Sequence, residues 1–170
     1  MARVTPSSIP PEFWPGVRLF AMDVDGILTD GTVAVASDGT ETKFFSVLDG
    51  LGLRRVLVAG FAVAWISGRE SGATTVRANE LKITRLVQGC NDKLSALKAI
   101  AEELRLSPGQ CLYMGDDDID VAAMKWAGLG ITVPGATPAA LCAAGCVTER
   151  PGGRGAVREV CDLLLARPGA

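Results

Sequence analysis

The 170-residue sequence contains no histidine. This absence excludes Ser-His-Asp hydrolysis, Cys-His proteolysis, histidine-ligated zinc and histidine phosphotransfer. Any acid–base chemistry must therefore come from carboxylates, lysine, tyrosine or cysteine. The chain also has no run of basic residues: 17 Lys and Arg stand against 19 Asp and Glu, for a net charge of −2. A nucleic-acid partner is therefore not expected.

Membrane and disulfide signals are missing as well. The longest charge-free stretch, residues 126–148, contains two prolines and four glycines, so it does not predict a membrane helix. The N-terminal residues have no apolar segment typical of a signal peptide. The five cysteines lack zinc-like spacing and are interpreted as small buried hydrophobes in a reducing compartment. We expect a cytoplasmic protein without a membrane partner.

The composition is that of a globular protein, with 48% hydrophobic and 21% charged residues. The length fits one domain with a single core. Residues 1–16 contain four prolines and are expected to form an N-terminal arm rather than core. Residues 17–170 are expected to form one domain that includes the C-terminal tail.

Strand-like and helix-like segments alternate along this domain. Expected strands cover residues 17–24, 61–66, 84–87, 110–114 and 129–133; expected helices cover 49–60, 70–81, 92–104, 116–128, 137–144 and 156–166. This alternation predicts an α/β, Rossmann-like fold with a mainly parallel sheet and helices on both faces. Two β-prone runs, 32–36 and 41–47, flank an Asp-Gly turn signal and predict a β-hairpin flap after the first strand.

Residues suited to phosphate chemistry follow the expected core strands. The first strand leads to Asp23 and Asp25, the second to Ser67-Gly68-Arg69, and the fourth to Asp116. Lys93 opens a helix after the third strand. Because the carboxyl ends of parallel strands meet at one edge of a sheet, these side chains are expected to converge.

The converging residues have complementary chemistry. Asp23, Asp25 and Asp116 would repel one another without a cation, and an all-oxygen ligand set suits Mg²⁺. Lys93 can neutralise a phosphoryl group, and the Ser67 hydroxyl can donate to its oxygens. Asp23 could then attack phosphorus, while Asp25 protonates the leaving oxygen and later deprotonates water.

Each element has an ordinary structural interpretation when it is taken alone. Asp-x-Asp and Ser67-Gly68 are common in turns, and a lysine at a helix start is usually solvated. The acidic cluster at Asp116–Asp120 could simply favour a helix dipole. All four elements in order after predicted strands favour the functional interpretation.

On these motifs, Asp23-x-Asp25-Gly26, Ser67, Lys93 and Gly115-Asp116-Asp117-x-x-Asp120, the chain resembles the haloacid dehalogenase superfamily of phosphotransferases. The resemblance implies that Asp23 is the nucleophile and Asp25 the general acid/base. It also implies Mg²⁺ held by the Asp23 carboxylate, the Asp25 backbone carbonyl and the Asp116 carboxylate.

The spacing between motifs excludes a cap domain. Asp25 and Ser67 are 42 positions apart, and Ser67 and Lys93 are 26 apart. The first gap holds one hairpin and one helix, and the second holds one helix and a short strand. The site is therefore expected to be open in a monomer, so another element must exclude water.

A narrower resemblance is to the 3-deoxy-D-manno-octulosonate 8-phosphate phosphatase family. Its carriers are residues 23–31 (DVDGILTDG), the hairpin, Asp49-Gly50, residues 66–69 (ISGR) and residues 152–159 (GGRGAVRE). It implies hydrolysis of that sugar-acid phosphate through an aspartyl-phosphate, in lipopolysaccharide biosynthesis. It further implies a homotetramer in which a neighbouring subunit completes each site. The implied substrate contacts are Asp25, Asp49, Gly50, Arg54, Ser67, Gly68, Arg69, Arg77, Lys93 and Arg154, the last on a tail that can close over substrate.

Several alternatives remain open at this stage. Leu48 stands where the family usually has a basic residue, so a nine-carbon acid, an acylneuraminate or deaminated neuraminate 9-phosphate, competes as substrate. Asp117, Asp118 and Asp120 have no assigned role. A non-catalytic, tetramer-forming module is a candidate of another class. A signalling receiver domain is disfavoured, because its acidic pair lies on the first strand, whereas here an acidic group follows Lys93.

Overall fold

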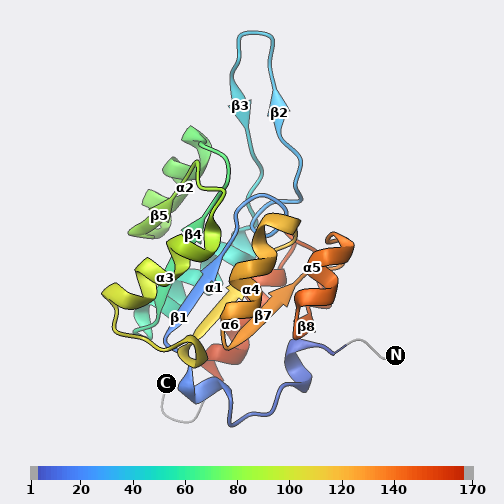
Figure 1. The fold of residues 1–170 in the computed structure, drawn as a ribbon. Helices are drawn as coiled ribbons and strands as arrows, with labels where there is room; N and C mark the ends of the chain where they lie inside the picture. The colour runs from blue at the N-terminus through green and yellow to red at the C-terminus, as the bar shows by residue number, and fades with distance from the viewer. Residues whose placement is uncertain (1–3, 167–170) are drawn as a thin grey trace.

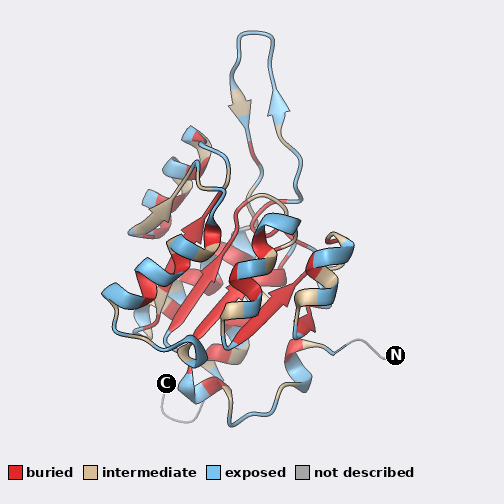
Figure 2. Cartoon of the chain, in the orientation of Figure 1, coloured by how far each residue is buried: buried red, intermediate tan, exposed pale blue. Residues whose placement is uncertain are grey.

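A six-stranded parallel sheet forms the centre of the computed structural model, which describes residues 4–166 (Figure 1). The strand order is β5-β4-β1-β6-β7-β8. The strands are β1 (Leu19–Met22), β4 (Ala62–Ile66), β5 (Arg85–Val87), β6 (Cys111–Met114), β7 (Leu129–Thr132) and β8 (Cys146–Val147). Every residue of β1, β6 and β7 is buried (Figure 2), as expected for strands covered on both faces.

Helices cover both faces of this sheet. On one face α1 (Val47–Val58) packs along α6 (Ala156–Leu165) and also contacts α2 (Gly72–Leu81). On the other face α3 (Lys93–Glu103), α4 (Val121–Trp126) and α5 (Pro138–Ala143) lie in series (Figure 1). The predicted α/β class with a parallel sheet and two helical layers is confirmed.

The order of the strands creates a crevice at one place. The chain adds β4 and β5 on one side of β1, and then returns to add β6, β7 and β8 on the other. Along the β1–β6 pair, Leu19 lies opposite Cys111 and Met22 opposite Met114. After β1 the chain continues to one side of the sheet, and after β6 it continues to the other side. Ligands of open α/β sheets bind at such a switch point, where the strand order reverses.

The predicted hairpin is present and extends well beyond the sheet (Figure 1). Its antiparallel strands are β2 (Ala34–Val35) and β3 (Glu41–Thr42), joined by a turn in which Asp38 Oδ1 accepts from the Thr40 N–H at 2.9 Å. Gly39 adopts a φ of +84°, which favours glycine. Between β1 and β4 the described chain holds this hairpin and α1, so the predicted lack of a cap domain is confirmed.

Three predicted boundaries were wrong. The second hairpin strand was expected over 41–47 but ends at Thr42, because its partner β2 is short and pairs only Ala34 with Thr42 and Val35 with Glu41. The helix after it begins at Val47 rather than at residue 49, since the Ser46 hydroxyl accepts from the Asp49 N–H and caps it. The helix expected over 116–128 divides into a 3₁₀ turn at Asp118–Asp120 and α4.

The described part of the predicted N-terminal arm packs against the domain. It contains two 3₁₀ turns, Pro6–Ser8 and Trp14–Gly16, and both contact α6. Trp14 is buried in the core, which the proline content did not indicate. The division into an arm and one domain stays a prediction, and residues 1–3 and 167–170 lie outside the described residues. Within residues 4–166, no helix combines the length and apolar character needed to span a membrane.

The buried carboxylate of Asp49 joins the two helices of one face. Its Oδ1 accepts from the Arg158 N–H at 2.7 Å and its Oδ2 from the Gly155 N–H at 3.2 Å. These amides belong to the start of α6, where helical N–H groups have no partner within the helix. Asp49 at the start of α1 therefore caps α6 from a distance of more than one hundred residues in sequence.

This contact predicts a stability defect for Asp49→Ala. Two buried amides would lose their acceptor, so the free energy of unfolding should fall by about 1–3 kcal/mol. Asp49→Asn keeps one acceptor oxygen and should lose less. Urea unfolding at fixed protein concentration measures the effect, with exposed Glu12→Ala as the matched carboxylate deletion. Equal stability of the Asp49→Ala and Glu12→Ala proteins would contradict this role.

Candidate active site

Asp23 begins the loop after β1 and points into the crevice. Its N–H donates to the Met114 carbonyl at 2.9 Å, which continues the β1–β6 pairing. Its Oδ1 accepts from the Val24 N–H at 2.6 Å, and its Oδ2 lies 2.7 Å from Lys93 Nζ. The carboxylate is thus fixed at both oxygens and almost fully buried. The arrangement presents a rigid, desolvated oxyanion at the switch point.

Lys93 is buried, unlike most lysines at helix starts. It is the first residue of α3, and its ammonium lies 2.7 Å from Asp23 Oδ2 and 2.8 Å from Asp120 Oδ1. Burial alone would lower the pKa of Lys93, but the two carboxylates outweigh it and raise the pKa above its usual range. The side chain is therefore a permanent cation against the nucleophile candidate.

Asp120, to which the sequence assigned no role, organises the loop after β6. Its Oδ1 accepts from Lys93 and from the Tyr113 hydroxyl at 2.9 Å. Its Oδ2 accepts from the N–H groups of Asp116 and Asp117 at 3.2 and 3.1 Å. With four donors on two oxygens, this fully buried carboxylate supports the site rather than facing a ligand.

The other two unassigned acids also have contacts. Asp117 Oδ1 accepts from the Asp118 N–H at 2.7 Å, at the start of the 3₁₀ turn. Asp118 Oδ1 accepts from the Thr137 hydroxyl at 2.8 Å, which links this turn to the start of α5. The acidic run thus combines a site residue, Asp116, with residues that shape the loop. Its spacing gives no sign of which is which.

The carboxylates fit a hard divalent cation. One oxygen each of Asp23, Asp116 and Asp120 lies within 4.8 Å of the others, and of these three only Asp23 and Asp116 line the cavity. Asp116 Oδ1 is buried and has no hydrogen-bond partner within residues 4–166. Burial and the neighbouring charges of Asp23 and Asp120 raise the pKa of Asp116 to about 7. Burial, followed by the charge of Asp120, raises the pKa of Asp23 to about 6. A cation would relieve both carboxylates, and an all-oxygen set suits Mg²⁺.

Gly26 lets the two acidic loops approach each other. A Cβ at this position would collide with the Asp116 carboxylate, and its φ of +88° also favours glycine. The close approach of backbone to carboxylate explains why Gly26 follows Asp25 in the motif.

A cavity of about 240 Å³ opens beside these groups. Its lining residues are Asp23, Asp25, Ser67, Gly68, Arg69, Asn91, Asp116, Asp117 and Ile119. Ser67 is buried at its wall, where its hydroxyl donates to the Arg69 carbonyl at 2.9 Å and accepts from the Arg69 N–H at 3.2 Å. The structure therefore brings together Asp23, Asp25, Ser67, Gly68, Arg69 and Asp116, with Lys93 directly behind Asp23.

Three cavity-lining residues and one neighbouring lysine were missed by the sequence analysis. Asn91 lies in the loop after β5, and Asp117 and Ile119 lie at the 3₁₀ turn after β6, where no spacing signal marks them as site residues. Lys43 comes from the hairpin arm and contacts both oxygens of Asp25, at 2.7 and 2.8 Å. A lysine in an alternating strand pattern usually faces solvent, so only its long-range contact reveals it.

Four predicted substrate contacts lie away from the cavity of this chain. Asp49 caps α6, as described above. Arg54 donates to the Leu81 carbonyl at 3.1 Å, at the end of α2. Arg77 pairs with Glu80 at 2.8 Å and donates to the Ser46 carbonyl at 3.3 Å. Gly50 makes room for Arg77, since a Cβ there would meet its guanidinium.

Arg154 lies on a glycine-rich loop beside the site. It lines an adjoining cavity of about 240 Å³, which Asp116 and Gly26 also line, and it approaches Asp30 at 3.8 Å. The loop packs directly on the chain after β1: the Gly153 N–H donates to the Ile27 carbonyl at 2.9 Å. A Cβ on Gly152 would overlap the Gly26 carbonyl oxygen. The Arg154 side chain itself is mainly exposed.

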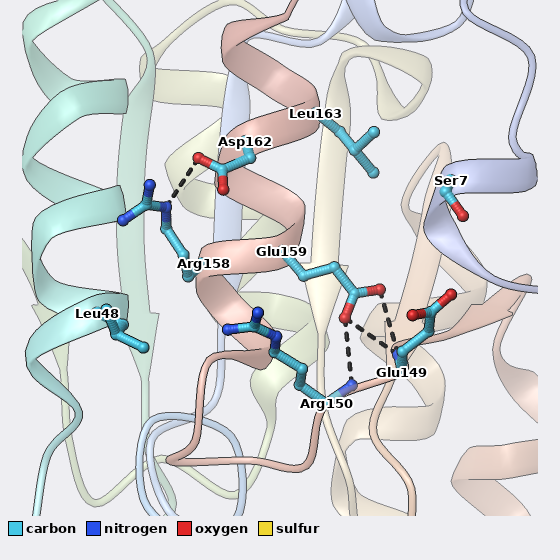
Figure 3. A pocket seen from close by; sticks show the side chains of 8 residues that line it. All are labelled: Ser7, Leu48, Glu149, Arg150, Arg158, Glu159, Asp162 and Leu163. Carbon is cyan, nitrogen blue, oxygen red and sulfur yellow. Dashed lines mark hydrogen bonds and ion pairs between the residues drawn. The ribbon is translucent and has the colours of Figure 1, made fainter.

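A larger cavity of about 580 Å³ lies between α1, α6 and the N-terminal segment. Figure 3 shows its lining: Ser7, Leu48, Glu149, Arg150, Arg158, Glu159, Asp162 and Leu163. Within this lining Arg158 pairs with Asp162 at 2.8 Å, and the Glu159 carboxylate accepts from the backbone N–H of Arg150 at 3.2 Å. The residues that follow the core strands, Asp23, Asp25, Ser67 and Asp116, do not line it, so it is not the candidate active site.

Comparison with known proteins agrees with this geometry. A sequence profile described as haloacid dehalogenase-like hydrolase matches residues 61–159. The chain is 44% identical over 153 residues to 3-deoxy-D-manno-octulosonate 8-phosphate phosphatase KdsC of Escherichia coli (strain K12), covering 90% of this chain and 81% of the relative. It is 45% identical over 149 residues to the protein of the same name from Yersinia pestis, covering 88% and 80%.

A solved structure shares the fold. It is 3-deoxy-D-manno-octulosonate 8-phosphate phosphatase from Moraxella catarrhalis in complex with magnesium ion, phosphate ion and a KDO molecule. The TM-score is 0.88 at 44% identity, and the match covers 91% of this chain and 89% of that chain. The resemblance expected from the sequence is confirmed.

The raised pKa values of Asp23 and Asp116 predict how stability depends on pH. Between pH 4 and 7 the folded protein holds protons that the unfolded chain releases, so these two groups make stability fall as pH rises. Asp116→Asn removes one of the two charges. In metal-free buffer, the melting temperature of Asp116→Asn minus that of wild type should therefore be larger at pH 7.5 than at pH 5.

In the presence of Mg²⁺, the melting temperature of wild type should instead gain on that of Asp116→Asn as pH rises. Protons compete with the cation for the carboxylates, so Mg²⁺ should raise the wild-type melting temperature more at pH 7.5 than at pH 5. Asp116→Asn should lose most of this gain, whereas exposed Glu102→Gln should keep it. Differential scanning fluorimetry measures both effects. A difference between Asp116→Asn and wild type that does not change with pH would count against the assignment.

Proposed function

We infer the function from the premise that this chain belongs to the haloacid dehalogenase-like hydrolase family, and propose that it hydrolyses 3-deoxy-D-manno-octulosonate 8-phosphate with Mg²⁺ as cofactor. Its similarity to 3-deoxy-D-manno-octulosonate 8-phosphate phosphatases over most of the chain makes it a phosphoric monoester hydrolase. The observation that carries the proposal is the Asp23 carboxylate, fixed 2.7 Å from buried Lys93 and beside Asp25 and Asp116 in one cavity. Relatives that are named as phosphatases of this eight-carbon sugar acid match most of the chain, which supports it as the substrate.

The first half of the reaction transfers the phosphoryl group to the protein. The Asp23 carboxylate attacks phosphorus, and the bond from phosphorus to the sugar oxygen breaks. Asp25 gives its proton to the departing oxygen. The Ser67 hydroxyl would turn from the Arg69 carbonyl to donate to a phosphoryl oxygen. Lys93, which its raised pKa keeps protonated, would stabilise the charge on these oxygens.

The second half returns the protein to its starting state. Asp25, now a carboxylate, takes a proton from water, and the resulting nucleophile attacks phosphorus. The bond between phosphorus and Asp23 breaks, which releases inorganic phosphate and regenerates both side chains. Burial of Asp23 limits access of bulk water to the acyl phosphate, so hydrolysis depends on the water that Asp25 activates.

The Asp23 and Asp116 carboxylates and the Asp25 backbone carbonyl would hold the Mg²⁺ ion. When bound, it neutralises the carboxylates and the phosphoryl oxygens, which lets two anions come together. The unpartnered Asp116 Oδ1 and the raised pKa values of both carboxylates support this ligand set.

We also propose a homotetramer in which a neighbouring subunit completes each site. Apolar side chains are exposed along the hairpin and the first part of α1: Val35, Phe44, Val47, Leu48 and Leu51. Exposed groups of this kind support an interface. Arg54, Arg77 and Gly50 lie outside this chain's cavity, so in our proposal any substrate contact they make is with a neighbour's substrate. Arg154 would close over the substrate within its own chain.

We place the enzyme in the cytoplasm, in the synthesis of lipopolysaccharide saccharides. Support for the location comes from the thiols of Cys111, Cys146 and Cys161, which are packed in the core as small hydrophobes. Burial raises the pKa of all three, so they stay protonated and unreactive.

Phosphate release tests the substrate. With Mg²⁺, kcat/KM for 3-deoxy-D-manno-octulosonate 8-phosphate should exceed that for an acylneuraminate 9-phosphate and for simple hexose phosphates. Asp23→Asn should lower kcat by at least about 10³-fold, because the nucleophile is lost, while its melting temperature stays within a few degrees. A preference for the nine-carbon acid would keep the mechanism and replace the substrate. Folded protein without activity on any of these would favour the non-catalytic module.

Light scattering tests the oligomer. A tetramer has four times the chain mass of 17.7 kDa, or about 71 kDa. Phe44→Glu combined with Val47→Glu places two charges on the proposed interface and should shift the mass toward monomer and lower kcat/KM. Val58→Glu is the control, since Val58 is equally exposed at the far end of α1. Dissociation by Val58→Glu, or a wild-type monomer, would contradict the proposal.

A further inference from the structure

Lys43 is buried although it lies on the exposed hairpin arm. Its side chain has no solvent exposure, whereas that of its neighbour Phe44 is largely exposed. Lysine is rarely buried without paired charge, because removing an ammonium from water is costly. The partner of Lys43 therefore indicates what the burial achieves.

That partner is Asp25, the residue proposed as general acid/base. Lys43 Nζ lies 2.7 Å from Asp25 Oδ1 and 2.8 Å from Oδ2, so it contacts the carboxylate on both oxygens. Thr74 Oγ1, on α2, accepts a longer hydrogen bond from the same ammonium at 3.4 Å. The hairpin thus contributes a cation to the cavity wall that the sheet edge does not supply.

The position of Lys43 is itself fixed by Glu41, two residues earlier on the same face of the arm. Glu41 accepts from Arg69 Nε at 3.0 Å and from its Nη2 at 2.7 Å, and it also accepts from the Ser71 hydroxyl. Glu41 Oε1 lies 3.9 Å from Lys43 Nζ. A continuous chain of contacts therefore runs from Arg69 through Glu41 and Lys43 to Asp25, and it holds the hairpin arm against the cavity.

Each of the two aspartates of the motif has its own lysine partner. Lys93 contacts Asp23 from α3, and Lys43 contacts Asp25 from the hairpin. Neighbouring carboxylates that each have a separate cation are kept apart in position and orientation. Asp25 can keep one oxygen on Lys43 while the other carries the proton toward the leaving group.

Building on the proposed function, we infer that Lys43 is a positioning residue for the acid–base step, holding the Asp25 carboxyl group toward the sugar oxygen. Lys43 itself does not touch the reacting atoms. The Asp25 side chain is partly exposed even with Lys43 in contact. Without Lys43 it could rotate into solvent, and proton transfer to the leaving oxygen would become slower.

Leaving-group dependence tests this inference. An alkyl phosphate such as 3-deoxy-D-manno-octulosonate 8-phosphate needs a proton on its leaving oxygen, whereas p-nitrophenyl phosphate releases a weakly basic phenolate. The ratio kcat/KM reports the steps up to leaving-group departure. Lys43→Met should lower kcat/KM for the alkyl phosphate by about 10²-fold and for p-nitrophenyl phosphate by at most about threefold.

A double-mutant cycle separates positioning from general damage. In an Asp25→Asn background, Lys43→Met should have no further effect on the alkyl phosphate, because the residue through which it acts is gone. Exposed Lys98→Met controls for loss of a lysine. If Lys43→Met does not fold, as judged by circular dichroism, Lys43→Gln keeps the length and a donor and should show the same selective loss to a smaller degree.

The outcomes distinguish the two proposals. An active wild type in which Lys43→Met loses the same factor on both substrates, or in which its effect adds to that of Asp25→Asn, overturns the role of Lys43 alone. A folded wild type that releases phosphate from neither substrate overturns the proposed function and the role of Lys43 together.

Discussion

The site depends on one buried chain of charges, Asp23–Lys93–Asp120. Three ionised groups without water are stable only when each has partners, and here the lysine contacts both carboxylates at 2.7 and 2.8 Å. The same Asp120 accepts from the loop after β6 and so determines where Asp116 lies. One interaction thus joins three segments of the chain and gives the nucleophile candidate its orientation.

The fold and the centre of the site could be predicted from the sequence because both follow from local patterns. Apolar strands that end in Asp23, Ser67 and Asp116 require a shared edge once the sheet is parallel. Short-range cues were less reliable: the boundaries around Val47 and the split helix after Asp116 depended on capping side chains. The strand β8 has two residues and carries too little pattern to be predicted.

The rest of the site depends on contacts that sequence spacing does not encode. Lys43 and Asp25 are 18 positions apart, and the hairpin must fold back before they meet. Arg54 and Arg77 show the opposite case, because charge suggested anion contacts whereas the structure gives them carbonyls and a glutamate nearby. The residue type predicted the chemistry of each side chain well, but which partner each side chain contacts could be learned only from the tertiary structure.

The contact between the glycine-rich loop and the chain after β1 has a mechanical consequence. The backbone of Gly152 and Gly153 packs directly on the backbone of residues 26–30, so no side chain lies between the two loops at this contact. A displacement of residues 26–30 would therefore be passed to the glycine-rich loop and, through it, to the start of α6. The wall formed by the hairpin is held differently, through the side chains of Lys43, Glu41 and Arg69. The two walls therefore differ in how substitutions would reach them: a side chain added at Gly152 or Gly153 would push the two loops apart, whereas shortening Glu41 or Lys43 would loosen the hairpin wall.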